Sequence, residues 1–317
     1  MAETMGLWER TKNIFRVTYT LTFVMASLTG VVFALSIRNE FLIAFLVLLA
    51  VFILALFVNF SNDYFDHVSG ADSKRFFSED KEFERGAREI LGPKIYWAGN
   101  AFDLGYITVS QGRIVMALLA AAAIIVSIPI ILYGGWIVIV LGLVAFFVSF
   151  FYTALPLNLG ARGLGELDVF LSFFMMSFFS YFVIVQRFSI PMFVIALTVG
   201  IAVALMRLVD EMSGYEAHLK AGEKDICVRI GLENAAVLAI GLAGLIYIIS
   251  SFLLLYSPAF LLLFLTAPLV FRMSGYLQNK GDRFRFVRPA PVVFMFAFSH
   301  MLLIVVSLIA QTFLTSV

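Results

Sequence analysis

Long apolar runs alternate along the chain with short stretches that carry charge. About 20 consecutive apolar residues cross a lipid bilayer as a helix, so each long run predicts one membrane span. The pattern predicts nine spans, at residues 17–37, 41–61, 114–132, 136–154, 167–186, 190–209, 234–256, 259–276 and 291–314. Residues 1–317 are therefore expected to form a single, all-α, polytopic membrane domain. Charge is concentrated in the N-terminal stretch and in loops 62–113, 155–166, 207–233 and 272–288.

With nine spans in order, all five charged stretches fall on one side of the membrane. Every Lys and Arg except Arg38 and Arg187 lies in these stretches, and Glu40 is the only acidic residue on the opposite side. Basic loops stay in the cytoplasm, so the N-terminus is expected inside and the C-terminus outside. The outer connections are too short to build a site. Any active site is therefore expected on the cytoplasmic face of a cell membrane.

The composition agrees with a membrane protein and excludes other classes. Hydrophobic residues make up 62% of the chain and charged residues 14%, whereas soluble domains average about 25% charged residues. The net charge of +1 and the lack of a basic stripe give no sign of nucleic-acid binding. Cys227 is the only cysteine, which excludes an intramolecular disulfide and a cysteine-based metal site.

An acidic cluster follows the second predicted span directly. Asn62, Asp63, Asp66 and Asp72 come within eleven positions, and acidic groups at the edge of a membrane indicate function by default. Spacings of three and four residues place such side chains on one helical face. Carboxylate and amide oxygens suit Mg²⁺, which binds through one or two carboxylates plus substrate phosphates. The alternative is a solvated helix end whose acids merely cluster.

A second acidic group opens the loop at 207–233. Asp210, Glu211 and Glu216 lie there, and Asp210, Gly214 and His218 follow at four-residue steps on one helical stripe. Two acidic groups that leave the membrane on the same side can share one metal–diphosphate unit. Nearby cations suit phosphate, because Arg offers two-pronged donation and Lys a compact charge. The candidates are Arg88, Lys94, Lys220 and Lys224.

Three segments resemble a known family. The run from Asn62 to Asp72 resembles the first aspartate-rich motif of the UbiA superfamily of intramembrane prenyltransferases. Two further segments, Tyr152–Glu166 and Gly222–Gly231, are similar to loops of its branch that contains the menaquinone-pathway 1,4-dihydroxy-2-naphthoate prenyltransferases and their archaeal relatives. Nine helices is also the number typical of this superfamily.

The resemblance implies a helical bundle around a central cavity that opens to the cytoplasmic side and to lipid. It implies Mg²⁺-assisted ionisation of a prenyl diphosphate and attack on the cation by an aromatic, quinone-precursor-like acceptor. Metal binding is expected at Asn62, Asp66, Asp72, Asp210, Glu211 and Glu216. Catalytic roles are expected for Asp63, Asp66, Tyr152 and Asp210, diphosphate binding also for Arg162, and substrate binding for Asn62, Asn158 and His218.

The second motif departs from the family pattern. Gly214 and His218 stand where the branch usually has aspartates. The remaining acids could rebuild the metal site, with or without a nitrogen from His218, or the metal could be weakly held. His prefers softer metals than Mg²⁺, so His218 is expected to face the diphosphate or support a ligand. Alternative functions are another prenyl-lipid reaction, such as cyclisation, hydration or transfer to a non-aromatic acceptor, and a lipid or ion transporter. Transporters, however, place such groups at mid-membrane.

Overall fold

The computed structural model describes residues 11–12, 14–70, 80–91, 100–152, 154, 157 and 159–315. These residues form helices and connecting turns, without a strand anywhere in those ranges. The fold is therefore all-helical, as the hydropathy pattern predicts.

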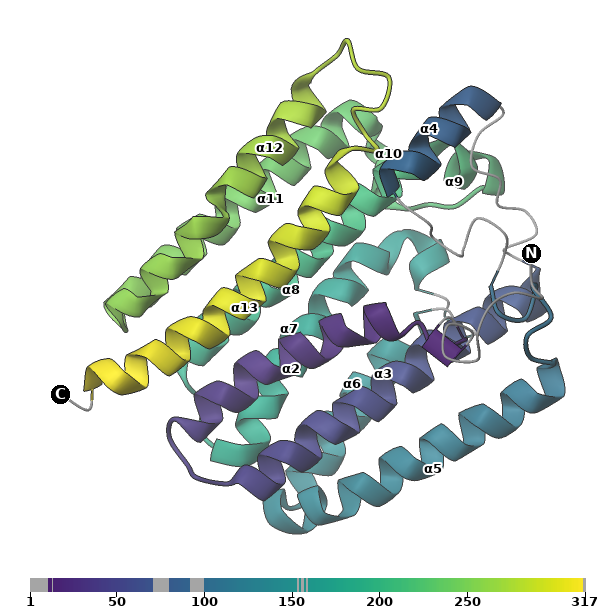
Figure 1. Ribbon diagram of the computed structural model, residues 1–317. Coiled ribbons are helices and arrows are strands. Elements are labelled where there is room, and N and C mark those ends of the chain that lie inside the picture. The colour runs from purple at the N-terminus through teal and green to yellow at the C-terminus, as the bar shows by residue number, and fades with distance from the viewer. Residues whose placement is uncertain are drawn as a thin grey trace.

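Long helices form the body of the molecule and run roughly alongside one another (Figure 1). They are α2 (Val17–Leu35), α3 (Phe41–Ser69), α5 (Val109–Gly134), α6 (Trp136–Phe150), α7 (Gly165–Val185), α8 (Ile190–Ser213), α11 (Leu232–Ser251), α12 (Ala267–Gln278) and α13 (Pro289–Thr315). Helix α11 continues into the 3₁₀ turn η5 (Phe252–Leu255), and the 3₁₀ segment η6 (Pro258–Thr266) leads into α12. Shorter helices are α4 (Lys81–Leu91), η4 (Gly160–Leu164), α9 (Tyr215–Ala221) and α10 (Ile226–Ile230).

The length and hydropathy of these helices identify a multi-pass membrane protein. Within the described ranges, seven helical segments are long and apolar enough to span a bilayer. Two shorter apolar helices, Tyr19–Leu35 and Trp136–Phe150, coincide with the first and fourth predicted spans. Seven of the predicted spans are thus confirmed as membrane-length helices. The count of nine stays a prediction.

Helices α2 and α7 cross at very close range because small residues line the contact. A Cβ atom on Gly30 would lie 2.0 Å from the carbonyl oxygen of Ser177, so only glycine fits there. Hydroxyl groups bond across the same contact, Thr29 to Ser177 at 2.6 Å and Ser27 to Ser180 at 2.7 Å. Close packing of small residues and interhelical hydrogen bonds from hydroxyl groups usually hold helices together in lipid. Burial of apolar surface contributes little free energy there, because the lipid chains are apolar too.

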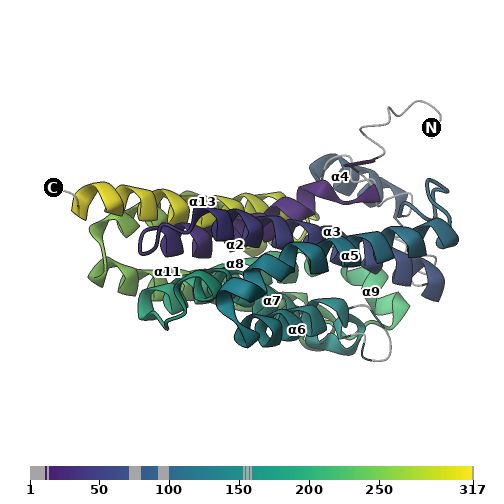
Figure 2. The same cartoon turned by 90° about the horizontal axis from the view of Figure 1, so that it is seen from below.

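The short helices gather at one end of the bundle. Both views place α4 and α9 at the end of the bundle opposite the C-terminal end of α13, and Figure 1 places α10 with them (Figures 1 and 2). Ion pairs join loops that are distant in sequence there: Arg283 binds Asp80 at 2.8 Å, and Arg285 pairs with Glu233. The described parts of loops 62–113, 207–233 and 272–288 therefore meet at the same end, as the charge pattern predicts.

Candidate functional site

Helix α3 carries the first acidic motif on its last two turns. The apolar span was predicted to end at 61, but the helix continues without a break to Ser69. Gly70 then ends it in the left-handed conformation, with φ of 69°, and its N–H bonds to the carbonyls of Asp66 and His67. Asn62 and Asp66 lie one turn apart and are both half-buried. Their two side chains are therefore held on a rigid helix end, on one face.

Asp63 belongs to a different face and is tied to the first helix. Its side chain is 1% exposed, and its Oδ2 accepts a hydrogen bond of 3.1 Å from Nε of Arg16, the residue that precedes α2. The backbone carbonyl of Asp63 accepts a second bond, of 3.0 Å, from Nδ2 of Asn100. Asp63 thus joins α2 and α3, and it is less accessible to a substrate than the catalytic role predicted for it requires.

The loop at 100–108 packs against this end of α3. Nδ1 of His67 lies 2.5 Å from Oδ1 of Asp103, and the His67 ring stacks on Phe102. Phe102 also packs against Phe60 and Tyr64. These contacts fix the two helical turns that carry the acidic motif.

A buried network of charges forms around Glu211, at the end of α8. Glu211 is 1% exposed and pairs with Arg207 one turn earlier. Nδ1 of His218, on α9, lies 2.6 Å from Oε2 of Glu211, 2.9 Å from Oδ2 of Asp225 and 4.0 Å from Glu223. One ligand atom from each of Glu211, His218, Glu223 and Asp225 falls within 4.8 Å of the others. The network therefore has the size of a metal site, but two cationic side chains already lie in it.

His218 is held in its charged form by these partners. Burial alone would lower its pKa, but the hydrogen bonds that His218 donates to Asp225 and Glu211, with the charges of Glu211 and Glu223, outweigh burial and raise the pKa to about 10. In turn, burial would raise the pKa of Asp225, yet the bond from His218 and the backbone N–H of Val228 lower it. His218 is thus an imidazolium at neutral pH, and a metal ion would have to displace that proton to use its nitrogen.

Glu166 and the loop before α7 join this network from the other side. Oε1 of Glu166 accepts a bond of 3.1 Å from the backbone N–H of Ile226, and the carbonyl of Arg162 accepts one of 2.8 Å from Nη2 of Arg229. Tyr152 lies next to them, with the guanidinium carbon of Arg207 5.8 Å from its ring centre. The described residues of segments 152–166 and 222–231, distant in sequence, therefore lie side by side.

Tyr152 is a neutral phenol in this environment. Burial raises its pKa; the charge of Arg207 opposes that rise, while Glu211, Asp168 and Glu166 add to it. The phenol can thus donate a hydrogen bond to a substrate oxygen at any physiological pH.

Two buried carboxylates, Glu166 and Asp168, received no role from the sequence. They are 6% and 5% exposed, and Oε2 of Glu166 and Oδ1 of Asp168 have no hydrogen-bond partner among the described residues. Buried carboxylate oxygens are normally satisfied, so orphaned ones suggest a ligand. The rule applied to Asn62–Asp72, that acidic residues beside the end of an apolar span indicate function, would also have identified Glu166 and Asp168.

The ends of α2, α3 and α8 meet around Tyr19. The charges of Asp210, Arg16 and Arg207 all act on its phenol. Arg16 also binds Asp63, next to the Asn62–Asp66 face. Nδ2 of Asn59 on α3 also donates to the hydroxyl of Thr20 on α2 at 3.1 Å, so the last turns of α3 and α8, which carry the two acidic groups, both lie near the start of α2.

The other predicted site residues lie nearer solvent or beyond the described ranges. Five of these predicted site residues are exposed at this end of the bundle: Arg88, Arg162, Glu216, Lys220 and Lys224. Arg88 donates from Nε to Glu84 at 3.0 Å on its own helix. Three predicted residues lie outside the described residues: Asp72, Lys94 and Asn158. The roles of all eight stay predictions.

These features define a class: a multi-pass helical membrane protein with two acidic groups drawn together at one end. The chain matches the UbiA prenyltransferase family over residues 104–300 and belongs to that family. The resemblance seen in its motifs is thereby confirmed.

Similar proteins agree with this membership. The chain is 24% identical over 293 residues to 1,4-dihydroxy-2-naphthoate octaprenyltransferase of Bacillus subtilis (strain 168), covering 88% of this chain and 85% of that protein. A structure of digeranylgeranylglyceryl phosphate synthase has a TM-score of 0.66 at 15% identity, covering 96% and 100% of the two chains. A UbiA homolog from Archaeoglobus fulgidus bound to GPP and Mg²⁺ has a TM-score of 0.64 at 15% identity, covering 94% and 99%.

Proposed function

We propose that the protein is an intramembrane prenyltransferase that moves a polyprenyl group from a prenyl diphosphate to an aromatic, quinone-precursor-like acceptor. The observation that carries this proposal is the position of the two acidic groups, Asn62–Asp66 on the last turns of α3 and Asp210 on the last turn of α8, both beside the start of α2. The similar homolog bound to GPP and Mg²⁺ supports the donor. The similar naphthoate octaprenyltransferase supports the acceptor.

The first motif and Asp210 fit Mg²⁺ better than the rest of the second motif does. Asn62, Asp66 and Asp210 offer the hard oxygen ligands that Mg²⁺ prefers. Glu211, by contrast, is already balanced by Arg207 and His218. We assign Mg²⁺ binding to Asn62, Asp66 and Asp210, with Asp72 from the sequence. Bound there, the ion would neutralise charge that develops on the departing diphosphate.

Exposed cations at the same end supply the remaining positive charge for the diphosphate: Arg88, Arg162, Lys220 and Lys224. Lys94 is proposed for the same role from the sequence alone. When the C–O bond to the prenyl carbon breaks, its electron pair leaves with the diphosphate. The acceptor ring then bonds to the allylic carbon and loses a proton.

Orphaned carboxylate oxygens on Glu166 and Asp168 are the proposed acceptors of that proton. The neutral phenol of Tyr152, beside them, orients the acceptor by donating a hydrogen bond, and Asn158 is proposed to help. Asp63, because it binds Arg16, holds α2 against the site; we assign it this positioning role in place of chemistry.

Turnover by the purified protein tests this function. The protein is placed in nanodiscs with Mg²⁺ and a dihydroxynaphthoate-like acceptor, and a panel of prenyl diphosphates is tested one by one. We expect free diphosphate and an acceptor heavier by one prenyl group, measured by mass spectrometry. Omission of Mg²⁺ should stop both products. If the protein released no diphosphate and bound no prenyl diphosphate, the proposed enzyme activity would be contradicted.

A non-aromatic acceptor is the second candidate. It is favoured by the altered second motif, in which His218 binds Glu211, and by the similar digeranylgeranylglyceryl phosphate synthase. Diphosphate release that no aromatic acceptor stimulates, with the prenyl group recovered on a glyceryl phosphate or as an alcohol or cyclic product, would select this candidate.

A further inference from the structure

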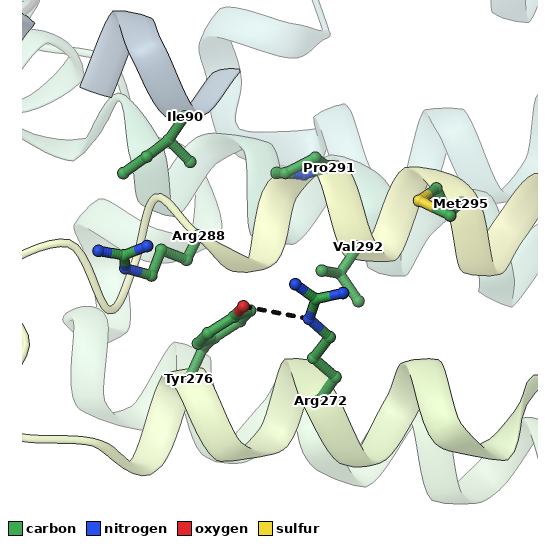
Figure 3. A pocket seen from close by; sticks show the side chains of 7 residues that line it. All are labelled: Ile90, Arg272, Tyr276, Arg288, Pro291, Val292 and Met295. Carbon is green, nitrogen blue, oxygen red and sulfur yellow. Dashed lines mark hydrogen bonds between the residues drawn. The ribbon is translucent and has the colours of Figure 1, made fainter. Parts of the chain in front are cut away.

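A groove of about 280 Å³ lies between α12 and α13, beside the end of α4 (Figure 3). Arg272, Tyr276 and Arg288 line its polar end, and Val292 and Met295 line its apolar side. None of these residues belongs to the candidate site described above. The groove lies on the surface of the bundle and not in its interior, since Met295 is 55% exposed and Arg272 is exposed as well.

Each of the two arginines is held by a hydrogen bond through its Nε. Nε of Arg272 donates to the hydroxyl of Tyr276 at 3.1 Å, and Nε of Arg288 donates to Oδ2 of Asp282 at 2.7 Å. Each guanidinium is thus tethered through Nε, and its two Nη groups remain for a further partner. Arg272 pairs with no carboxylate in the described part of the chain, so one positive charge at the groove is not balanced.

The groove lies near one end of two membrane-length helical segments. Arg272 lies six residues before the end of α12 at Gln278, about 9 Å along the helix axis, and Arg288 immediately precedes α13. Below the arginines the surface is apolar and exposed: Met295 and Leu302 lie two turns apart on α13, and Leu265 continues the strip on the neighbouring segment. A ligand with an anionic head and an apolar chain fits both parts.

We propose that this groove binds one anionic phospholipid, with its phosphate on Arg272 and Arg288 and an acyl chain along Met295 and Leu302. Basic pockets between helices at a membrane boundary are the usual sites for such headgroups. The unbalanced charge of Arg272 favours a net anionic lipid over a zwitterionic one. The apolar strip gives a lipid an advantage over a soluble phosphate.

Native mass spectrometry of the full chain tests this site. With equal amounts of phosphatidylglycerol and phosphatidylcholine added in detergent, the wild-type protein should retain one phosphatidylglycerol in preference. Arg272→Gln and Arg288→Gln should each weaken that retention about fivefold, the effect of one basic residue near a charged membrane surface. Lys280→Gln removes the same charge from the exposed loop and should change little. Equal retention of both lipids, or an equal loss in Lys280→Gln, would overturn the proposal.

Two further arms distinguish a lipid site from a site for a soluble anion or for the substrate. Inorganic phosphate and geranyl diphosphate should fail to displace the retained lipid; displacement by either would show an anion or substrate site instead. Arg272→Lys keeps the charge and guards against misfolding of the Gln variant. It should retain phosphatidylglycerol better than Arg272→Gln, since the charge remains although the paired Nη donors are lost. Loss in Arg272→Lys as large as in Arg272→Gln would refute the role assigned to the charge.

Discussion

Two of the charged side chains buried at one end of this bundle, Asp63 and Glu211, are matched by partners from outside their own helix. Asp63 on α3 binds Arg16 before α2, and Glu211 on α8 binds His218 on α9. A buried charge without a partner is strongly unfavourable, so these pairs hold the helix ends in place. The same pairing leaves fewer acids free for metal than the sequence suggests.

Replacing Asp63 should damage stability more directly than chemistry. Asp63→Asn leaves the Arg16 guanidinium without its anion and should lower the free energy of unfolding by about 2–3 kcal/mol. Thermal unfolding in detergent measures this loss, and Arg16→Gln with Asp63→Asn should recover part of it, because no unpaired charge remains. Asp66→Asn, on the half-buried face, should leave the unfolding temperature nearly unchanged. An unchanged unfolding temperature in Asp63→Asn would contradict the pairing.

His218 should make stability depend on alkaline pH. Its pKa is raised from 6.5 to about 10 in the folded protein, so its contribution is complete below about pH 6.5 and is lost as pH rises toward 10. The unfolding temperature of the wild type should therefore fall across this interval. His218→Gln has no such titration and should show a flatter profile; parallel profiles would mean that His218 is not charged in the fold.

At the scale of elements, hydropathy predicts helices well and their polar ends poorly. The apolar run at 190–209 became α8, but the helix continues to Ser213 and carries Asp210 and Glu211 on its last turn. Helix α3 likewise continues to Ser69. A span predicted from hydropathy ends at the first polar residues, whereas the helix itself continues until a residue such as Gly70 ends it.

Pairings between distant segments could not be predicted from the sequence. Arg16 and Asp63 are 47 positions apart, and Glu166 and Ile226 are 60 apart. Local spacing indicated that Asn62 and Asp66 share a face, and the four-residue step from Arg207 to Glu211 fits their ion pair. It could not show that His218, on the next helix, also pairs with Glu211. Such partners depend on how helices pack, which the pattern of a single chain does not encode.

The loop before α7 should be sensitive to substitution at Gly163. This residue has φ of 78°, and a Cβ atom there would lie 2.1 Å from the backbone carbonyl oxygen of Lys224. Gly163→Ala should therefore push loop 152–166 away from 222–231 and lower both stability and turnover. Gly222→Ala is the matched control, because its φ of 74° imposes similar strain in open space. That strain alone costs about 1 kcal/mol. Equal effects in thermal unfolding would contradict the close packing.

At the scale of the whole molecule, the single buried cysteine makes topology measurable. Cys227 is 0% exposed, so cysteines introduced at Glu82 and Arg187 should be the main targets of a membrane-impermeant maleimide. We expect the cysteine at 82 to react only from the cytoplasmic side and the one at 187 only from the outside. If both introduced cysteines reacted from the same side, the predicted orientation would be wrong. The chain would then not cross the membrane an odd number of times between residues 82 and 187.

The central claim is that the Asn62–Asp66 face binds a prenyl diphosphate together with Mg²⁺. Binding of geranylgeranyl diphosphate to nanodisc-embedded protein, measured by titration with and without Mg²⁺, tests it most directly. We expect tight binding that needs Mg²⁺ in the wild type and in Glu82→Gln, an exposed carboxylate at the same end. In Asp66→Asn the affinity should fall at least tenfold, about 1.4 kcal/mol. Equal affinity in Asp66→Asn, or binding that ignores Mg²⁺, would contradict the claim.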